Sequence, residues 1–336
     1  MTRIRSIASA LPERRVTNED LVRENPSWDM AAVTERAGVR TRRVAAPDET
    51  SFDLSVRACE ELFADSELDP GDVDAILYCT QSPDYLMPGN SNLLHRHLEL
   101  GDEVLAFDFT LACSGYVYGL AVADSFVRAG LASEILLVTA ETYSKYIHPR
   151  DRTTRALFGD AAAVTHVSAA GGGGRVAAAA LCSSGRDLDK GAYIPGGGMR
   201  FRHSEDTARE VADDHGNVRS AEHIHLNGPA VWTFINSTVP RHVRGFLADQ
   251  GLTMDDVDLC VFHQASKLAL DSLAKALGLD ERKLFVHMED IGNVASASIP
   301  LALRAALDEG AIQPGSRVLL SAYGAGMSYG SVLVEY

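Results

Sequence analysis

Apolar residues along this chain follow two alternating patterns. Short, mostly apolar runs such as Val104 to Phe109, Glu134 to Ala140 and Arg317 to Ala322 are typical of strands buried on both faces. Between such runs, apolar residues recur at helical spacing, most densely after Ser114. The repeated order of strand and helix predicts a layered α/β fold.

The most apolar stretch, Glu103 to Gly130, joins a predicted strand to a predicted helix, and Cys113 lies at the joint. The apolar positions of this helix are Tyr116, Val117, Leu120, Ala121, Ala123 and Phe126. They leave almost no polar face, so we expect the helix to be buried in the domain centre. A thiol at the start of a helix faces free N–H groups and the positive end of the dipole, which predicts a thiolate nucleophile. The alternative is that Cys113 only fills the core.

The chain also contains an internal repeat. Phe63 to Cys79, FADSELDPGDVDAILYC, aligns without gaps on Leu247 to His263, LADQGLTMDDVDLCVFH, so the offset is 247 − 63 = 184 residues. Both segments combine a helix end, a turn, Asp-Val-Asp and a buried strand. Chance similarity of two βα units is the alternative explanation.

The next unit of the repeat supports two related halves, residues 1–170 and 171–336. A predicted strand over Lys283 to Asp290, a turn at Gly292-Asn293 and a helix over Ala295 to Leu307 correspond to the strand, the Cys113 turn and the helix of the first half. The first half would therefore deliver the thiol. The second would deliver His263 and Asn293.

Between the predicted halves lie segments with little apolar content. His203 to His223, HSEDTAREVADDHGNVRSAEH, is predicted to be an exposed excursion of the second half, over about residues 203–223. The glycine runs at 171–174 and 196–198 lack the G-x-x-x-x-G-K-[ST] pattern of a phosphate-binding loop. His223 and His225 form an H-x-H pair, but no third ligand stands at useful spacing, so we expect no metal site.

Composition and charge argue against several classes of function. The 336 residues are 46% hydrophobic and 23% charged, as in ordinary globular proteins. A formal net charge of −15 argues against nucleic-acid binding, which needs a basic face. Five scattered cysteines without a C-x-x-C pair predict free thiols. No window approaches about 18 uninterrupted apolar residues, so we expect a cytoplasmic protein without a membrane segment.

Cys113, His263 and Asn293 are the candidate active-site residues. Each follows a predicted strand, and open α/β sheets bind their ligands at the carboxyl ends of strands. A histidine after a strand, or a Gly-Asn turn, has an ordinary structural explanation by itself. The three together, tied to the repeat, indicate one site.

Five segments carry a resemblance to a known family: DFTLACSGYVYGL, HPRDRTTRALFGDAAA, VFHQAS, GNVASASIPLAL and YGAGMSYGSVLVEY. They resemble the successive signatures of β-ketoacyl-ACP synthase III, one of the thiolase-fold condensing enzymes, and the likeness runs nearly end to end. The resemblance implies a thiolase-like five-layered αβαβα fold made of two related halves. It also implies a homodimer that takes acyl-CoA and malonyl-ACP as substrates, without a permanently bound cofactor.

The resemblance further implies a role for individual residues. Cys113 matches the nucleophile that becomes acylated, while His263 and Asn293 match the residues that bind the malonyl carbonyl. The backbone N–H groups of Cys113 and Ala325 match the oxyanion hole. The implied substrate contacts are Arg36 and Arg152 for CoA, and Met87 (reaching across the dimer), Ser266 and Phe158 for the acyl pocket.

Cys113, His263 and Asn293 suit the chemistry of a condensation. Once Cys113 is acylated, loss of CO2 from the malonyl group puts negative charge on a thioester oxygen, and the N–H donors of Asn293 and of a neutral His263 would stabilise it. Acyl transfer to ACP, a hydroxyl or an amine without decarboxylation is the alternative. Papain-like hydrolases share the order Cys, His, Asn but need C-G-[SA]-C-[WY] near an exposed cleft.

Some positions depart from the family pattern. Ser266 stands where the family commonly has Asn, and Ala325 stands where glycine is usual. Ala32 occupies the position of the family's CoA-stacking tryptophan, with Trp28 four places earlier. These differences leave open whether CoA or ACP brings the acyl group, and whether the pathway makes fatty acids or a polyketide-type product such as an antibiotic.

Overall fold

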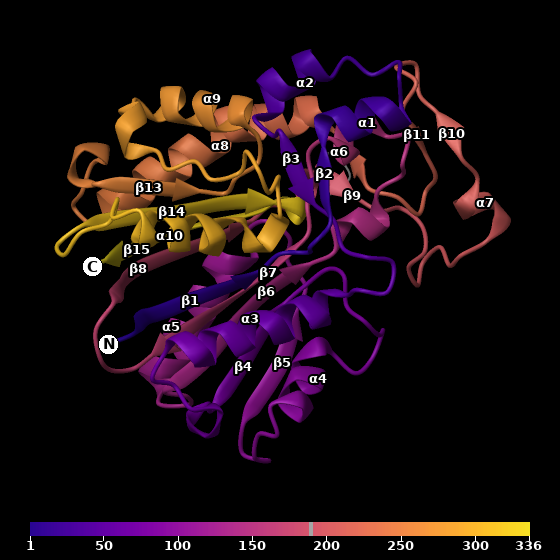
Figure 1. Ribbon diagram of the computed structural model, residues 1–336. Coiled ribbons are helices and arrows are strands. Elements are labelled where there is room, and N and C mark those ends of the chain that lie inside the picture. Colours follow the sequence, from indigo (N-terminus) through magenta and orange to yellow (C-terminus); the bar gives the residue numbers. More distant parts are fainter. Residues whose placement is uncertain (188–190) are drawn as a thin grey trace.

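A computed structural model of the protein describes residues 1–187 and 191–336. In these residues one nine-stranded sheet runs in the order β13-β14-β15-β8-β1-β7-β6-β4-β5. Its two parts join where β1 pairs with β8, at Arg3–Arg175 and Ile4–Gly174. Because this junction is short, the two parts separate beyond it into two sheet layers (Figure 1).

The first part of the sheet contains β1 (Arg3–Ala10), β4 (Ala75–Cys79), β5 (Leu105–Phe109), β6 (Glu134–Glu141) and β7 (Ala161–Ser168). The second contains β8 (Gly174–Ser183), β13 (Leu259–Phe262), β14 (Arg317–Gly324) and β15 (Ser328–Glu335). The small two-stranded sheets are β2 (Arg15–Thr17) with β3 (Thr41–Arg43), β9 (Ala192–Tyr193) with β12 (His225–Leu226), and β10 (Val211–Ala212) with β11 (Val218–Arg219).

The α-helices are α1 (Asn18–Glu24), α2 (Met30–Ala37), α3 (Ser51–Asp65), α4 (Asn90–His97), α5 (Gly115–Ala129), α6 (Arg152–Arg155), α7 (Glu205–Ala208), α8 (Gly228–Asp249), α9 (Lys267–Leu277) and α10 (Ser298–Asp308). Short 3₁₀ turns are η1 (Pro70–Asp72), η2 (Tyr143–Tyr146), η3 (Gly185–Asp187), η4 (Met254–Asp256), η5 (Glu281–Lys283), η6 (Ala295–Ala297) and η7 (Ala325–Met327).

The strands are apolar throughout because helices cover both of their faces. In β4, Ala75 and Leu77 pack toward the central core that contains α5 and α10. Ile76 and Tyr78, which alternate with them, pack toward α3 and α4 on the outer face. A strand buried on both sides therefore reads as a continuous apolar run rather than an alternating one.

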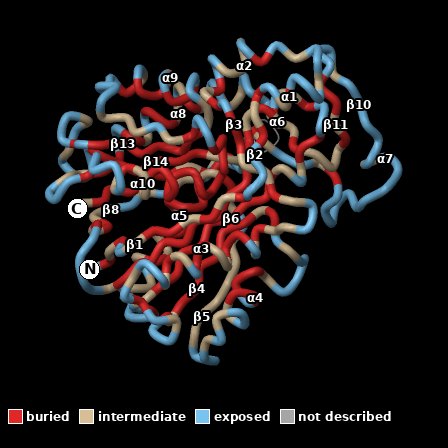
Figure 2. The backbone as a smooth tube through the Cα atoms, in the orientation of Figure 1, coloured by how far each residue is buried: buried red, intermediate tan, exposed pale blue. Residues whose placement is uncertain are grey.

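The second half repeats this layering. Val261 of β13 faces the central core, while Cys260 and Phe262 face the outer cluster that contains α8 and α9. The layers are thus α3/α4, first sheet, α5/α10, second sheet and α8/α9 (Figure 1), with buried residues concentrated in the middle layers (Figure 2). The predicted five-layered αβαβα fold made of two related halves is confirmed.

The predicted helix after Cys113 is present, whereas the predicted strand over Lys283 to Asp290 is not. The buried helix after Cys113 is α5, which ends where Gly130 adopts the left-handed conformation at φ 68°. The predicted strand over Lys283 to Asp290 is wrong, since this segment contributes a single parallel bridge, Cys260–Leu284. Its backbone is bound instead by other groups: the Gln264 side chain accepts from the N–H of His287.

The polar segment 203–223 forms α7 and the β10–β11 hairpin, which project from the body of the molecule (Figure 1). It is tied back where His148 Nε2 meets Glu210 at 2.9 Å and where the Val218 N–H donates to Arg150 O at 3.1 Å. The division of the chain at residue 170 stays a prediction; β7 ends at Ser168 and β8 begins at Gly174. Of the helices that the structure describes, none has the length and apolar character to cross a bilayer.

Candidate active site

A cavity of about 580 Å³ is lined by residues from both halves, and Cys113, His263 and Asn293 all line it. Cys113 comes from the loop between β5 and α5, and His263 directly follows β13. Asn293 lies in the turn before η6. The structure therefore brings together the three residues that the sequence predicts to form one site.

Cys113 lies against the backbone of Gly324, the last residue of β14. A β-carbon on Gly324 would stand 3.0 Å from the Cys113 nitrogen and 3.1 Å from the Cys113 β-carbon. Such contacts leave no room for a side chain, so the absence of a β-carbon at residue 324 lets the two backbones approach. Cys113 itself precedes Ser114, the N-cap of α5, rather than lying in the first helical turn.

The protonation state of Cys113 differs from the sequence-based prediction. Burial raises the pKa of the thiol to about 12, and the carboxyl of Glu141 adds to the rise. A helix N-terminus contributes typically about 0.3–1 kcal/mol, less than one pKa unit, so it does not offset this desolvation. The prediction of a resting thiolate is therefore wrong, because a thiol with a pKa this high is protonated at neutral pH.

His263 is held by its backbone, whose N–H donates to Ser321 O at 2.9 Å. Its ring stands edge-on to Tyr323, with centroids 5.7 Å apart. Burial lowers the pKa of His263 to about 3, so the imidazole is neutral at physiological pH. A neutral ring has one N–H, which suits the donor role expected for this residue.

Asn293 is fixed by the other half of the chain. Its N–H donates to Leu157 O at 2.9 Å, and its carbonyl accepts from the Gly159 N–H at 3.0 Å. Its side-chain Oδ1 accepts from the Ala295 N–H at 3.0 Å, while Nδ2 stands 3.3 Å from Ala265 O. Because Oδ1 is engaged by a backbone donor, the amide is oriented with its N–H donors on the other side.

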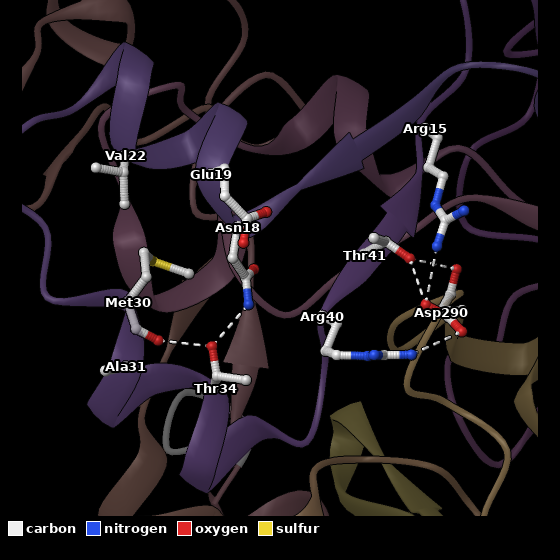
Figure 3. Close-up of a pocket in the computed structure, with 10 residues that line it drawn as sticks. All are labelled: Arg15, Asn18, Glu19, Val22, Met30, Ala31, Thr34, Arg40, Thr41 and Asp290. Carbon is white, nitrogen blue, oxygen red and sulfur yellow. Dashed lines mark hydrogen bonds and ion pairs between the residues drawn. The ribbon is translucent and has the colours of Figure 1, made fainter.

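The segment before Asn293 is bound by residues in and next to β2 and β3. The N–H groups of Arg40 and Thr41 both donate to Glu289 O, at 2.7 and 3.1 Å. Figure 3 shows Arg15, Arg40 and Thr41 converging on Asp290, at 3.1, 3.4 and 3.0 Å. The Arg15, Arg40 and Asp290 side chains are half exposed, so the ion pairs contribute little and the backbone bonds do most of the holding.

The remaining predicted site residues divide into two groups. Phe158, Ser266, Ala325 and Arg36 line the same cavity, with Ser266 also capping α9 through its hydroxyl, which accepts from the Ala269 N–H at 3.2 Å. Arg152, at the start of α6, and Met87, with 82% of its surface exposed, lie outside the cavity. The predicted role of Met87 in the acyl pocket of a partner subunit stays a prediction.

The structure adds residues that sequence reasoning missed. Trp232 of α8 lines the cavity and is 40% exposed. Glu141, the last residue of β6, is fully buried close enough to raise the Cys113 pKa. Trp232 could have been singled out because the chain has only two tryptophans. Nothing in the sequence singles out Glu141, which stands at the end of an apolar run. All five cysteines are free, as predicted.

The chain is similar in sequence to known proteins. A family model described as 3-oxoacyl-[acyl-carrier-protein] synthase III matches residues 107–185, and the model of its C-terminal part matches residues 247–336. A β-ketoacyl-[acyl-carrier-protein] synthase III of Rhizorhabdus wittichii is 35% identical over 329 residues, which are 98% of this chain and 97% of the relative.

Solved structures show the same likeness. A crystal structure of a 3-oxoacyl-(acyl-carrier-protein) synthase III has a TM-score of 0.96 and 39% identity, and covers 100% of this chain and 99% of its own. The priming β-ketosynthase of the R1128 polyketide biosynthetic pathway has a TM-score of 0.84 and 28% identity, covering 100% of this chain and 96% of its own.

Proposed function

This chain belongs to the β-ketoacyl-ACP synthase III family, and from that premise we propose that it loads an acyl group onto Cys113 and condenses it with malonyl-ACP. The observation that carries the proposal is the cavity that gathers Cys113, His263 and Asn293 from three separate elements. The enzyme needs no bound cofactor in this scheme, because side chains and substrates supply all the reacting groups.

The two steps balance with one proton taken from solvent in the second. In acylation, Cys113 Sγ attacks the thioester carbonyl, the carrier sulfur leaves, and the thiol proton passes to that sulfur. In condensation, the malonyl thioester loses CO2, and the resulting enolate carbon attacks the acyl-enzyme carbonyl and expels Cys113 as a thiolate. That thiolate takes up a proton from solvent, because the pKa of Cys113 is high in this cavity.

The surroundings of Asn293 favour condensation over simple acyl transfer. Acyl transfer needs an oxyanion hole for one tetrahedral intermediate, whereas decarboxylation needs added donors for a thioester enolate. The Asn293 amide is oriented by the Ala295 N–H, so that Nδ2 faces Ala265 O. An Asp at this position would set a carboxylate oxygen against that carbonyl and would offer the enolate no N–H.

The test separates the two steps. Cys113→Ala should form no acyl-enzyme when offered acyl-CoA, as read by intact-mass spectrometry. Asn293→Asp should still acylate, but its pre-loaded acyl-enzyme should release CO2 and form product about 10²-fold or more slowly on mixing with malonyl-ACP. The matched control is Asn92→Asp, the same change at an exposed position of α4, which should keep both rates.

One outcome would replace the proposal by its alternative. If wild-type enzyme passes its acyl group to an acceptor without releasing CO2, and Asn293→Asp does so equally well, the enzyme is an acyltransferase and not a condensing enzyme. Condensation is supported if wild-type enzyme releases CO2 from malonyl-ACP only after Cys113 has been acylated.

The rim of the cavity supports a large thioester carrier. Arg36 is exposed at the cavity, and Trp232 presents an indole there. A guanidinium suits a phosphate and an indole suits a base or the pantetheine arm, so acyl-CoA is the proposed donor. The likeness to a polyketide priming ketosynthase keeps both fatty-acid and polyketide biosynthesis as settings for the reaction.

Two exposed features support a homodimer. β5 is an edge strand of the large sheet, with all five of its residues half buried, and an edge of this kind can pair with a second copy. Tyr85, Leu86 and Met87 form an apolar run that is 59%, 93% and 82% exposed. Cover from a partner would bury this run, and would place Met87 at the partner's acyl pocket.

Free thiols support a reducing compartment. We therefore place the enzyme in the cytoplasm, where CoA and ACP thioesters are made, and cell fractionation is the check on this placement.

A further inference from the structure

Glu141 is a buried carboxyl group that the proposed chemistry does not use. It ends β6, has no solvent exposure, and no lysine, arginine or histidine in the described parts of the chain forms an ion pair with it. Burial raises its pKa to about 8. An isolated buried acid costs stability, and such groups gather at functional sites because they do work there.

The carboxyl group joins two segments that lead to the active site. It accepts from the Gln81 N–H at 3.1 Å and from Ser82 Oγ at 3.0 Å, both in the loop after β4. It also accepts from Ser296 Oγ at 3.2 Å, in η6 of the other half. Glu141 thus bridges the two halves of the chain.

The turn that it holds is strained. Ala295 has a φ of 48°, a left-handed conformation that a residue with a β-carbon adopts at a cost of about 1–3 kcal/mol. Such a conformation persists only where its surroundings determine it. On one side of the turn, the Ala295 N–H donates to Oδ1 of Asn293. On the other side, the hydroxyl of the next residue, Ser296, donates to the Glu141 carboxyl group.

Ser296 also touches the start of α5. A β-carbon on Gly115, two residues after Cys113, would lie 3.3 Å from the Ser296 β-carbon. The Ser296 position therefore bears on both the Asn293 turn and the loop of the nucleophile. However, the hydrogen-bonded connection from Glu141 leads to Asn293, whereas Cys113 is held by the packing of Gly324.

We propose that Glu141 is a positioning residue which, through Ser296, holds the strained turn that aims the Asn293 amide, and that it thereby supports condensation more than acylation. This inference rests on the proposed condensation function. It assigns Glu141 no contact with substrate.

The charge of Glu141 has a second effect. The ionisable groups whose pKa its charge raises are Cys79 of β4, Cys113, and Tyr143 and Tyr146 of η2. A carboxylate here would also oppose the negative charge that develops in the cavity. Condensation by the wild type should therefore fall relative to Glu141→Gln as pH rises through about 8, since the amide does not ionise.

The experiment uses the full-length enzyme and measures the two steps separately. Ser296→Ala removes the hydroxyl donor and leaves Glu141 bound by Gln81 and Ser82, so it should slow condensation of the pre-loaded acyl-enzyme about 10-fold or more while changing acylation less than about 2-fold. Glu141→Ala should do the same more severely. The matched control is Ser298→Ala: Ser298 Oγ is buried two residues further on and has no hydrogen-bond partner among the described residues.

The outcomes are distinct from those that test the function itself. If wild type condenses but Ser296→Ala slows both steps equally, or slows neither, the positioning role is overturned while the condensation function stands. If Glu141→Ala does not fold, Ser296→Ala and the pH dependence of Glu141→Gln still decide. An equal effect of Ser298→Ala would also overturn the proposal.

Discussion

Gly324 offers the sharpest test of how Cys113 is held. Its φ of −163° and ψ of −169° are extended backbone that any residue adopts, so alanine would bring no backbone strain. What alanine would bring is a β-carbon 3.0 Å from the Cys113 nitrogen, 3.1 Å from the Cys113 β-carbon and 3.3 Å from the Ser114 nitrogen. All three neighbours belong to the loop that carries the nucleophile.

The size of the effect follows from these distances. Ordinary van der Waals contacts begin at about 3.4 Å, so Gly324→Ala must push the Cys113 loop away by up to about 0.4 Å. A misplacement of about 1 Å can cost about 10²-fold in rate, so a shift of this size predicts about 10-fold slower acylation. Overpacking should also cost about 1–3 kcal/mol of stability.

The assay is the rate of acyl-enzyme formation after mixing with acyl-CoA, followed by intact mass and divided by the fraction of protein that acylates at all. That division separates a misplaced thiol from unfolded enzyme. Gly245→Ala is the control, because this glycine of α8 has no atom within 4 Å of an added β-carbon and should gain helix stability. Wild-type acylation by Gly324→Ala would refute the argument that the 113–114 loop rests on residue 324.

The other predictions concern the partner and the donor. Met87→Asp puts a charge on the exposed apolar run, so sedimentation velocity should show a weaker dimer than wild type, and a wild type that is an active monomer at micromolar concentration would contradict the dimer. Arg36→Ala or Arg152→Ala should raise the KM for acyl-CoA with little change in kcat, the mark of lost uniform binding. The same variants should leave the KM for an ACP-borne donor nearly unchanged, and an unchanged KM for acyl-CoA would place both arginines outside the CoA site.

The layers of the fold could be predicted from the sequence because burial on both faces leaves a plain record. Continuous apolar runs gave β4, β6 and β14, and the repeat tied β4 to β13. The predicted strand at 283–290 was wrong for a physical reason. Its apolar pattern matched β5, but apart from one bridge to β13 its backbone groups bind Gln264, Arg40 and Thr41.

The residues of the site could be predicted from the sequence, but their burial and the pKa of Cys113 could not. Residue order and motif indicated Cys113, His263 and Asn293, which line one cavity. The pKa of Cys113 was predicted in the wrong direction because burial and the charge of Glu141 depend on packing, whereas a helix N-terminus can be read locally. Trp232 was missed because α8 reaches the cavity only through the tertiary fold.

The backbones of the two halves cross closely at Asn293. A β-carbon on Gly159 would lie 2.2 Å from Ile291 O, and one on Gly292 would lie 2.8 Å from Leu157 O. Those two glycines face each other where the Leu157 carbonyl and the Gly159 N–H bind the backbone of Asn293. These contacts set Asn293 against the first half of the chain. The position of the amide is therefore fixed by backbone atoms of the opposite half, and the two halves must pack correctly before the site exists.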